Sequence, residues 1–225
     1  MKAACLWSGG KDSCFACWRA RAGGHEVRRL VNFISGDGRD AFHRVRRELM
    51  CLQSEALGIP IIQRETTPET YETVYGGVMG ELREMGIEGL VTGDMDVVQH
   101  QQWVDEHCRE VGLKALMPLW GLSPEETLSD FVDAGFEAVV VCAKADFFDE
   151  TWLGRKLDGR LVADLKAISP DSGFHICGEN GEYHTLVVNG PCFTKRISVT
   201  QGERVWRDGY GFFDIDRAKL IDKVV

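Results

Sequence analysis

The loop Ser8–Ser13, with the sequence Ser-Gly-Gly-Lys-Asp-Ser, constrains the fold of this chain more than any other stretch. It follows a short apolar run, residues 3–7, which predicts a buried first strand. It precedes Cys14, Cys17 and Trp18, whose i, i+3, i+4 spacing predicts one face of a helix. Where a strand turns at two glycines into a helix, the first N–H groups of that helix are unpaired and point at any bound anion. The sequence therefore predicts a strand–loop–helix unit that binds phosphate.

The side chains of this loop suit a polyphosphate ligand. Ser8 and Ser13 provide hydroxyl donors, and Lys11 provides a positive charge. Gly9 and Gly10 allow the backbone to approach the anion closely. The loop is not of the Walker A type. That motif needs Gly-Lys-Ser/Thr with another glycine a fixed distance before it, and this sequence does not have that pattern. The simpler alternative is a strand–turn–helix corner without a ligand.

The composition limits the class of protein. A chain of 225 residues with 44% hydrophobic residues suits one large domain or two small ones. The formal net charge of -9 argues against nucleic acid as a partner held mainly by charge. Arg44, Arg46 and Arg47 could form a local basic patch, although a solvated helix face explains them more simply.

The chain is expected to be cytoplasmic. Met1 lies directly before the first predicted strand, so cleavage of a signal peptide would remove the phosphate loop. No apolar run approaches the ~20 residues of a membrane span, so we expect no membrane partner. The 8 cysteines are then expected to be reduced thiols.

Strands and helices alternate in the first half of the chain. Five strands are expected, at residues 3–7, 31–34, 59–62, 89–92 and 113–119. Helices are expected from about 43 to 57, from Thr67 onward and from about 99 to 111. This order predicts an α/β fold with a doubly wound, parallel, five-stranded, Rossmann-like sheet. Ligands bind such sheets at the carboxyl ends of the strands, where the loops at Ser8, Ser35 and Gly93-Asp94 all lie.

The pattern changes after Trp120. Ser123-Pro124-Glu125-Glu126 predicts a capped helix that ends at Gly135. Short strands are expected at residues 136–141, 186–188, 197–199 and 212–215. We therefore expect an ATP-binding domain at residues 1–120 and a smaller α+β domain for substrate recognition at residues 121–225.

A second unusual stretch, Gly178–Thr185, lies in the second half. Glu179 and Glu182 flank Asn180-Gly181, a pair that suits a tight turn with positive φ. Taken alone, the stretch is more simply an acidic hairpin.

Together, the two motifs resemble the diphthine–ammonia ligase (diphthamide synthetase) family of N-type ATP pyrophosphatases, whose phosphate loop is Ser-Gly-Gly-x-Asp-Ser. The likeness extends over nearly the whole chain and includes Phe42-His43, Gly58-Ile59-Pro60, Gly93-Asp94, Pro118-Leu119-Trp120, Gly135-Phe136, Leu153-Gly154 and Asn189-Gly190-Pro191. The resemblance implies that ATP adenylates the carboxylate of diphthine, a modified histidine on a translation elongation factor. Pyrophosphate leaves, and ammonia then displaces AMP to form an amide.

The resemblance also implies the site residues. The nucleotide would contact Ser8, Gly9, Gly10, Lys11, Asp12, Ser13, His43, Gly93 and Asp94. Asp12 and Asp94 would hold Mg²⁺, and the catalytic groups would be Lys11, Asp12, Glu179 and Glu182. For His43, helix capping is an equal alternative. The expected partners are ATP, ammonia and the acceptor carboxylate, with a homodimer as a further option.

The chain departs from the family pattern at two places. His184 stands where the family has a second acid, and residues 99–103 lack an arginine that the family carries after Gly-Asp. Both segments are expected to face the acceptor. These departures are compatible with a bacterial branch of the family, in which that elongation-factor histidine is not known to be modified.

Two other functions fit parts of the sequence. Cys14 and Cys17 form a Cys-x-x-Cys like that of some tRNA thiolases built on this loop, although the same spacing suits core packing. A regulatory module that senses ATP or AMP without turnover would also need the loop. The acidic residues favour catalysis over such a module.

Overall fold

The computed structural model describes residues 1–41, 43–168 and 173–223. The chain divides into two compact units. The first unit comprises Met1–Ser8, Asp12–Phe42 and Ile59–Gly121, and the second comprises Gly9–Lys11, His43–Gly58 and Leu122–Val225. The middle of the phosphate loop thus groups with the second unit. A two-domain division after residue 120 stays a prediction.

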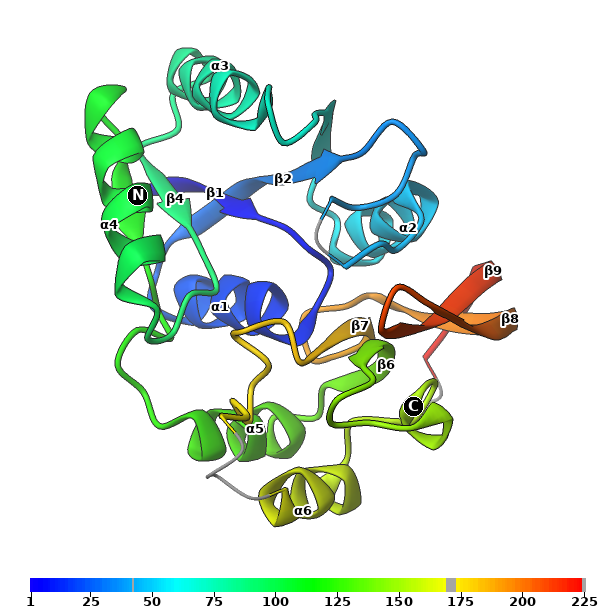
Figure 1. Ribbon diagram of the computed structural model, residues 1–225. Helices are drawn as coiled ribbons and strands as arrows, with labels where there is room; N and C mark the ends of the chain where they lie inside the picture. The colour runs from blue at the N-terminus through cyan, green and yellow to red at the C-terminus, as the bar shows by residue number, and fades with distance from the viewer. Residues whose placement is uncertain (42, 169–172, 224–225) are drawn as a thin grey trace. The chain divides into compact units, whose positions relative to one another are not determined.

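The first unit contains a parallel sheet of five strands. Its order is β3-β2-β1-β4-β5, with β1 at Lys2–Leu6, β2 at Glu26–Ile34, β3 at Ile61–Glu65, β4 at Gly89–Val91 and β5 at Lys114–Leu116. In Figure 1, α1 (Lys11–Ala22) lies on one face, and α3 (Tyr71–Glu84) and α4 (Val98–Glu110) lie on the other. The predicted doubly wound sheet is confirmed. Because the strand order reverses between β1 and β4, ligands are expected beside their carboxyl ends.

Apolar side chains of the sheet and of α3 and α4 form the core of this unit. The strands contribute Ala4, Val31, Phe33 and Leu90, and the helices contribute Tyr75, Val78, Met79, Leu82, Val104 and Cys108. The sheet is therefore covered by apolar surface along α3 and α4, while polar side chains collect at its carboxyl edge.

Two predicted helices begin later than expected. The helix expected from residue 43 is α2, Arg47–Leu57, because Arg44 has a left-handed φ of 60° that a helix cannot contain. It ends at Gly58, as predicted, with φ 67°. The helix expected from Thr67 is α3, which begins at Tyr71. The Thr67 amide donates to Thr70 Oγ1 at 2.9 Å, so these residues form a turn first.

The second unit contains an antiparallel sheet of four strands, in the order β7-β6-β9-β8. The strands are β6 (Glu137–Lys144), β7 (Tyr183–Asn189), β8 (Lys195–Arg207) and β9 (Tyr210–Asp222). The helices α5 (Pro124–Asp133) and α6 (Gly159–Ala167) and the short 3₁₀ helix η1 (Glu150–Trp152) complete it together with α2. The predicted helix cap is confirmed, since Ser123 Oγ accepts from the Glu126 amide at 3.4 Å. The expected α+β architecture, with the smaller of the two sheets, is also confirmed.

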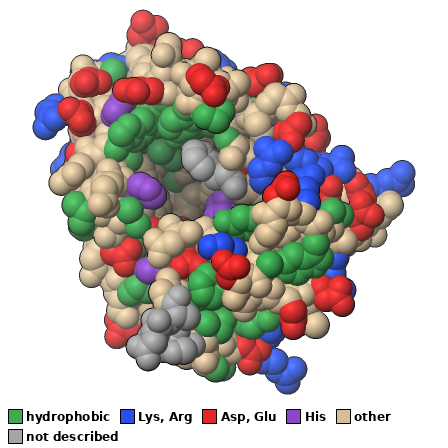
Figure 2. Space-filling view, viewed as in Figure 1, with side chains coloured by type: hydrophobic (Ala, Val, Ile, Leu, Met, Phe, Trp, Pro, Cys, Tyr) green, Lys and Arg blue, Asp and Glu red, His purple; other side chains and the backbone are tan. Residues whose placement is uncertain are grey.

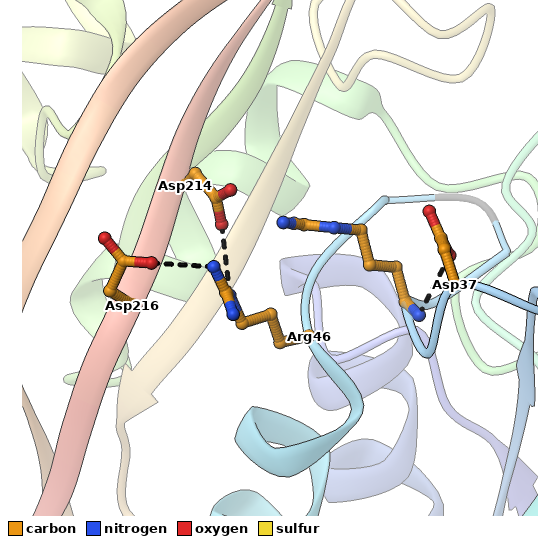
Figure 3. Close-up of polar contacts among 5 residues, drawn as sticks. Asp37, Arg46, Asp214 and Asp216 are labelled. Atoms are coloured by element: carbon orange, nitrogen blue, oxygen red, sulfur yellow. Dashed lines mark hydrogen bonds and ion pairs between the residues drawn. The ribbon is translucent and has the colours of Figure 1, made fainter.

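The β8–β9 hairpin is much longer than the strands that the sequence predicts. Its turn is Asp208-Gly209, with φ of 52° and 79°. Asp-Gly between two strands is a strong hairpin signal, and the sequence analysis did not use it. In the same unit, Arg46 at the start of α2 contacts Asp214 at 3.3 Å and Asp216 at 2.6 Å, both on β9 (Figure 3). Thr194 Oγ1 donates to the Ala56 carbonyl at 2.8 Å, so the start of α2 is joined to β9 and its end to the residue just before β8.

No helix in the described ranges has both the length and the apolar character needed to cross a bilayer.

A buried asparagine links three strands at the carboxyl edge of the parallel sheet. Asn32, 1% exposed on β2, donates to the Trp7 carbonyl at 2.9 Å and to Asp40 Oδ2 at 2.6 Å. The side-chain oxygen of Asn32, Oδ1, accepts from Gln63 Nε2 of β3 at 3.1 Å. Asp40 is also buried, so its carboxylate depends on protein donors.

We predict that Asn32→Leu destabilises the protein by about 2–4 kcal/mol, because it removes a donor from a buried carboxylate. Chemical denaturation measures the change. Ser35→Ala, which removes a partly exposed hydroxyl from the adjoining loop, is the control and should change stability by less than about 1 kcal/mol. Equal, small effects of both substitutions would contradict this assignment.

Candidate active site

The first unit brings two predicted site segments together at the carboxyl edge of β1 and β4. A Cβ atom on Gly93 would lie 2.8 Å from the Asp12 carbonyl carbon and 2.8 Å from the Ser13 nitrogen. Only glycine therefore allows the loop after β4 to approach the first turn of α1 this closely. The contact brings the backbone of Asp12 next to that of Gly93-Asp94. Ser8 Oγ and Ser13 Oγ lie 3.1 Å apart, so the two loop hydroxyls also meet.

The surroundings of Asp94 are polar and partly accessible. Its carboxylate lies 3.4 Å from His100 Nδ1, and the Asp94 side chain is 19% exposed. At the end of β4, Thr92 is 2% exposed, and its hydroxyl has no hydrogen-bond partner among the described residues. Buried hydroxyls are normally paired, so an unpaired one beside the predicted site indicates a place for a ligand or ordered water.

The middle of the phosphate loop is fixed by hydrogen bonds within the second unit. The Gly9 carbonyl accepts from the Val187 amide of β7 at 2.9 Å and from Gln53 Nε2 at 2.9 Å. Gln53 Nε2 also donates to the Val187 carbonyl at 2.8 Å, and the Lys11 amide donates to Thr185 Oγ1 at 3.0 Å. These hydrogen bonds join the middle of the loop to α2 and to β7.

The sequence analysis did not identify Gln53. It lies on α2 with 0% exposure, among the buried residues Leu49, Met50, Ala56 and Leu57. A polar residue at a core position of an amphipathic helix is the signal that could have found it, because a buried amide must have partners.

Lys11 is buried, with 4% exposure. Its ammonium group donates to the Cys177 carbonyl and lies 4.9 Å from the centre of the Tyr183 ring. Lys11 therefore contacts the segment just before the acidic turn, and its backbone contacts Thr185 just after it. Contact of Lys11 with phosphate stays a prediction.

Glu182 holds the acidic turn together. It is 2% exposed, and its Oε1 accepts from the His175 amide at 2.7 Å and from Asn180 Nδ2 at 3.3 Å. Its Oε2 accepts from the Asn180 amide at 3.1 Å. Gly181 has the positive φ expected for the turn, at 80°. The carboxylate of Glu182 is thus directed at donors inside the turn, whereas Glu179 is only half-buried.

His175 also organises the turn, and no sequence pattern marked it. Its Nδ1 accepts from the Cys177 amide at 3.1 Å and from the Glu179 amide at 3.5 Å. Gly178 has φ 74°, and a Cβ there would lie 2.6 Å from the Tyr183 carbonyl oxygen. The turn therefore requires glycine at this position.

His43 and His184 stack on each other in the second unit, with ring centres 4.3 Å apart and planes 19° apart. A Cβ on Gly10 would lie 2.5 Å from His43 Cε1, so His43 packs directly on the phosphate loop. Helix capping by His43 is wrong, because the N-cap of α2 is Arg46. Phe42, which the resemblance pairs with His43, lies outside the described residues.

Both imidazoles are held neutral. Burial lowers the pKa of His43 well below its ordinary value, and the neighbouring His184 and Lys11 lower it further. Burial and then the Lys11 charge lower the pKa of His184 to about 4. A pair of neutral rings therefore lies beside the cationic lysine of the loop.

Two domain families match this sequence. The first is described as the diphthamide synthase N-terminal domain and matches residues 1–115, and the second as the diphthamide synthase C-terminal domain and matches residues 123–221. The chain belongs to the diphthamide synthase family. The first match contains the phosphate loop and Gly93-Asp94, and the second contains the acidic turn.

Several relatives are named diphthine–ammonia ligase. The rat protein is 29% identical, and the alignment covers 98% of this chain and 91% of that protein. The human protein is 26% identical, and the alignment covers 99% of this chain and 91% of that protein. The Schizosaccharomyces pombe protein is 30% identical, with 91% of this chain and 37% of that protein covered. A crystal structure from Methanocaldococcus jannaschii, described as a "predicted subunit of tRNA methyltransferase", aligns with a TM-score of 0.49 at 17% identity over 85% of this chain and 98% of that one. That similarity is too weak to bear on function.

The cysteines give no support to a thiolase in this family member. Cys14 and Cys17 are 0% and 2% exposed on the inner face of α1. Burial, together with Cys17, raises the pKa of the neighbouring Cys5 thiol well above its usual range. Among the residues that the structure describes, no three His, Cys, Asp or Glu side chains form a metal-binding group. The Cys-x-x-Cys spacing is therefore core packing.

The neutral histidine pair predicts a pH dependence of stability. His184 is uncharged in the folded state, where its pKa is about 4, and titrates near 6.5 when unfolded. As the pH falls from ~6.5 toward ~4, the unfolded state binds a proton at this side chain and the folded state does not. The free energy of unfolding therefore decreases over that range. When the pH is lowered from about 7.5 to about 5, the free energy of unfolding should fall by about 2 kcal/mol more in the wild-type protein than in the His184→Gln variant.

Urea denaturation at the two pH values measures this difference. His100→Gln, which replaces a histidine whose side chain is 57% exposed, should leave the pH dependence of the wild-type protein unchanged. If the His184→Gln protein kept the full pH dependence, the buried pair would not be its source.

The acidic turn predicts a separate effect on stability. Glu182→Gln places an amide NH₂ group among the donors of His175 and Asn180, so at least one of them loses its acceptor. We expect a loss of about 1–3 kcal/mol in the free energy of unfolding. Glu179→Gln is the matched control and should cost less than about 1 kcal/mol, because Glu179 is half-buried.

Proposed function

We propose that this protein is an ATP-dependent ligase that converts the carboxylate of diphthine, or a closely similar carboxylate, into an amide. The observation that carries the proposal is the match of both halves of the chain to the two diphthamide synthase domains. The curated relatives named diphthine–ammonia ligase align over 91% of their own length in rat and human. The geometry of the phosphate loop supports the ATP-dependent half of the reaction.

In the first step, a carboxylate oxygen of the acceptor attacks the α phosphorus of ATP, and the bond to pyrophosphate breaks. The departing pyrophosphate gains negative charge, which preorganised donors stabilise better than water does. Ser8, Ser13 and the loop amides supply such donors, and Lys11 supplies a positive charge close to the loop. Because hydrogen bonds to Gln53 and Val187 already fix the loop, it needs little rearrangement when ATP binds.

Asp12 and Asp94 suit a magnesium ion that accompanies ATP. Mg²⁺ is usually bound through one or two carboxylates, with phosphate oxygens and water completing its shell. The close approach of Gly93 to the Asp12 backbone supports this assignment, because Asp94 directly follows Gly93. When bound, the ion would neutralise charge on the phosphates.

In the second step, ammonia attacks the carbonyl carbon of the acyl-adenylate, loses a proton and displaces AMP. Glu179 is our choice for holding the incoming ammonium and accepting its proton, because it is only half-buried. Glu182 then acts as a positioning residue, since its oxygens accept from the amides of the turn. His43 packs on Gly10 and would contact the nucleotide.

The acceptor would be carried by a translation elongation factor, and the reaction would take place in the cytoplasm. A homodimer is compatible with this function but not required by it.

The identity of the products tests this proposal. With ATP, Mg²⁺, ammonium and a diphthine-bearing elongation factor, we expect AMP, pyrophosphate and an amidated acceptor, detected by chromatography and mass spectrometry. Lys11→Ala and Asp12→Asn should each lower kcat/KM by about 100-fold or more, because each removes charge that stabilises the transition state.

Lys166→Ala is the matched control, because this lysine is exposed and only pairs with Glu125 on the surface. It should retain wild-type turnover. Formation of ADP and phosphate, or unchanged turnover in both loop variants, would contradict the proposal.

A further inference from the structure

The first unit carries an aromatic cluster that the reaction described above does not use. It consists of Phe33 on β2, Tyr71 and Tyr75 on α3, and Trp103 and His107 on α4. His107 stacks on Trp103 with ring centres 3.9 Å apart, and Tyr75 meets the indole edge-on at 4.5 Å. Each ring is thus fixed by at least one other ring of the cluster.

Part of this cluster reaches the surface. Tyr75 is fully buried, whereas Tyr71 and Trp103 are only partly buried. Their ring centres lie 5.9 Å apart, with planes 30° apart. Figure 2 shows hydrophobic side chains gathered on the surface in the region between α3 and α4. Tyr71 and Trp103 therefore form one aromatic surface supported by buried rings.

Negative charge lies close to this surface. Burial raises the pKa of the Tyr71 phenol, and the carboxylates of Asp40 and Asp94 raise it further. Burial, Cys108, Tyr71 and Asp94 together raise the pKa of Tyr75. The hydroxyl of Tyr75 has no hydrogen-bond partner among the described residues. Asp94 also lies 3.4 Å from His100 Nδ1, one turn before Trp103 on α4, so a carboxylate lies close to the rings.

Aromatic rings together with a nearby carboxylate favour a cationic ligand. A quaternary ammonium group cannot form hydrogen bonds, so proteins recognise it by the negative faces of aromatic rings and by nearby carboxylates. A neutral nucleobase would stack on the same rings and could donate an amino hydrogen to a carboxylate, but it carries no net positive charge. The charge around the cluster therefore favours the cation.

We infer that Tyr71 and Trp103 bind the quaternary ammonium group of the acceptor. This inference rests on the proposed function, because diphthine carries a trimethylammonium group on the carbon next to its carboxylate. Asp94 follows Gly93, which contacts the first turn of α1 at the phosphate loop. An ammonium group held by these rings would place the reacting carboxylate, one carbon away, toward the edge of the sheet where ATP and its Mg²⁺ are expected. The rings select the acceptor by its charge and position its carboxylate.

Choline and its neutral isostere 3,3-dimethylbutan-1-ol provide the direct test. The two have the same shape and differ in charge, so binding by cation–π contact should favour choline about tenfold. Titration by NMR, with saturation transfer from aromatic protons to the methyl groups, measures both affinities. Trp103→Leu and Tyr71→Leu should each weaken choline binding about fivefold or more, and Trp103→Phe should restore most of it.

Trp152→Leu is the matched control, because it removes another partly exposed tryptophan that stacks with Arg155 in the second unit. It should leave choline binding unchanged. Equal binding of choline and the alcohol, or no binding of choline, would overturn the inference.

ATP affinity is measured on the same variants and should stay unchanged. If Trp103→Leu weakened ATP and choline binding equally, the rings would bind the nucleobase and the inference would be wrong. Choline binding needs no turnover, so failure of the ligase reaction in the product assay contradicts the proposed function separately. In the full reaction, Trp103→Leu should raise the KM for the acceptor and leave the KM for ATP unchanged.

Discussion

Attachment of the phosphate loop to strand β7 is the constraint on which the site depends. A loop that binds phosphate must direct N–H groups toward the ligand, so its remaining polar groups need partners within the protein. Here the Gly9 carbonyl is satisfied by Val187 and Gln53, and Lys11 is held by Thr185 and Cys177. The residues that hold the loop thus come from α2 and from the segments around the acidic turn.

This arrangement assigns different roles to residues that look alike in the sequence. Glu182 is buried among amide donors of its own turn, whereas Glu179 is half-buried. A carboxylate whose oxygens already accept from the amides of its own turn has little capacity left to bind a substrate. His184 is kept neutral by burial and by Lys11. The second unit therefore places a neutral ring pair beside the positive charge of Lys11.

Local sequence predicted the elements better than their ends. Period and composition identified the five parallel strands, because buried strands are continuous apolar runs. The start of α2 was missed, since the left-handed conformation of Arg44 is not a usual preference of arginine. The long β8–β9 hairpin was underestimated, because many of its residues are polar and exposed, and only its Asp-Gly turn marks it.

The sequence by itself determined the class of fold, the phosphate loop, the acidic turn and the family, because each depends on residues that are close along the chain. Only the tertiary structure decided what contacts those motifs. Gln53, Thr185 and Cys177 hold the loop from positions distant in sequence, and His43 contacts His184, which lies 141 positions further along the chain. Such contacts depend on burial and strand register, which no local pattern encodes, so chemically similar side chains acquire different roles only when the chain is folded.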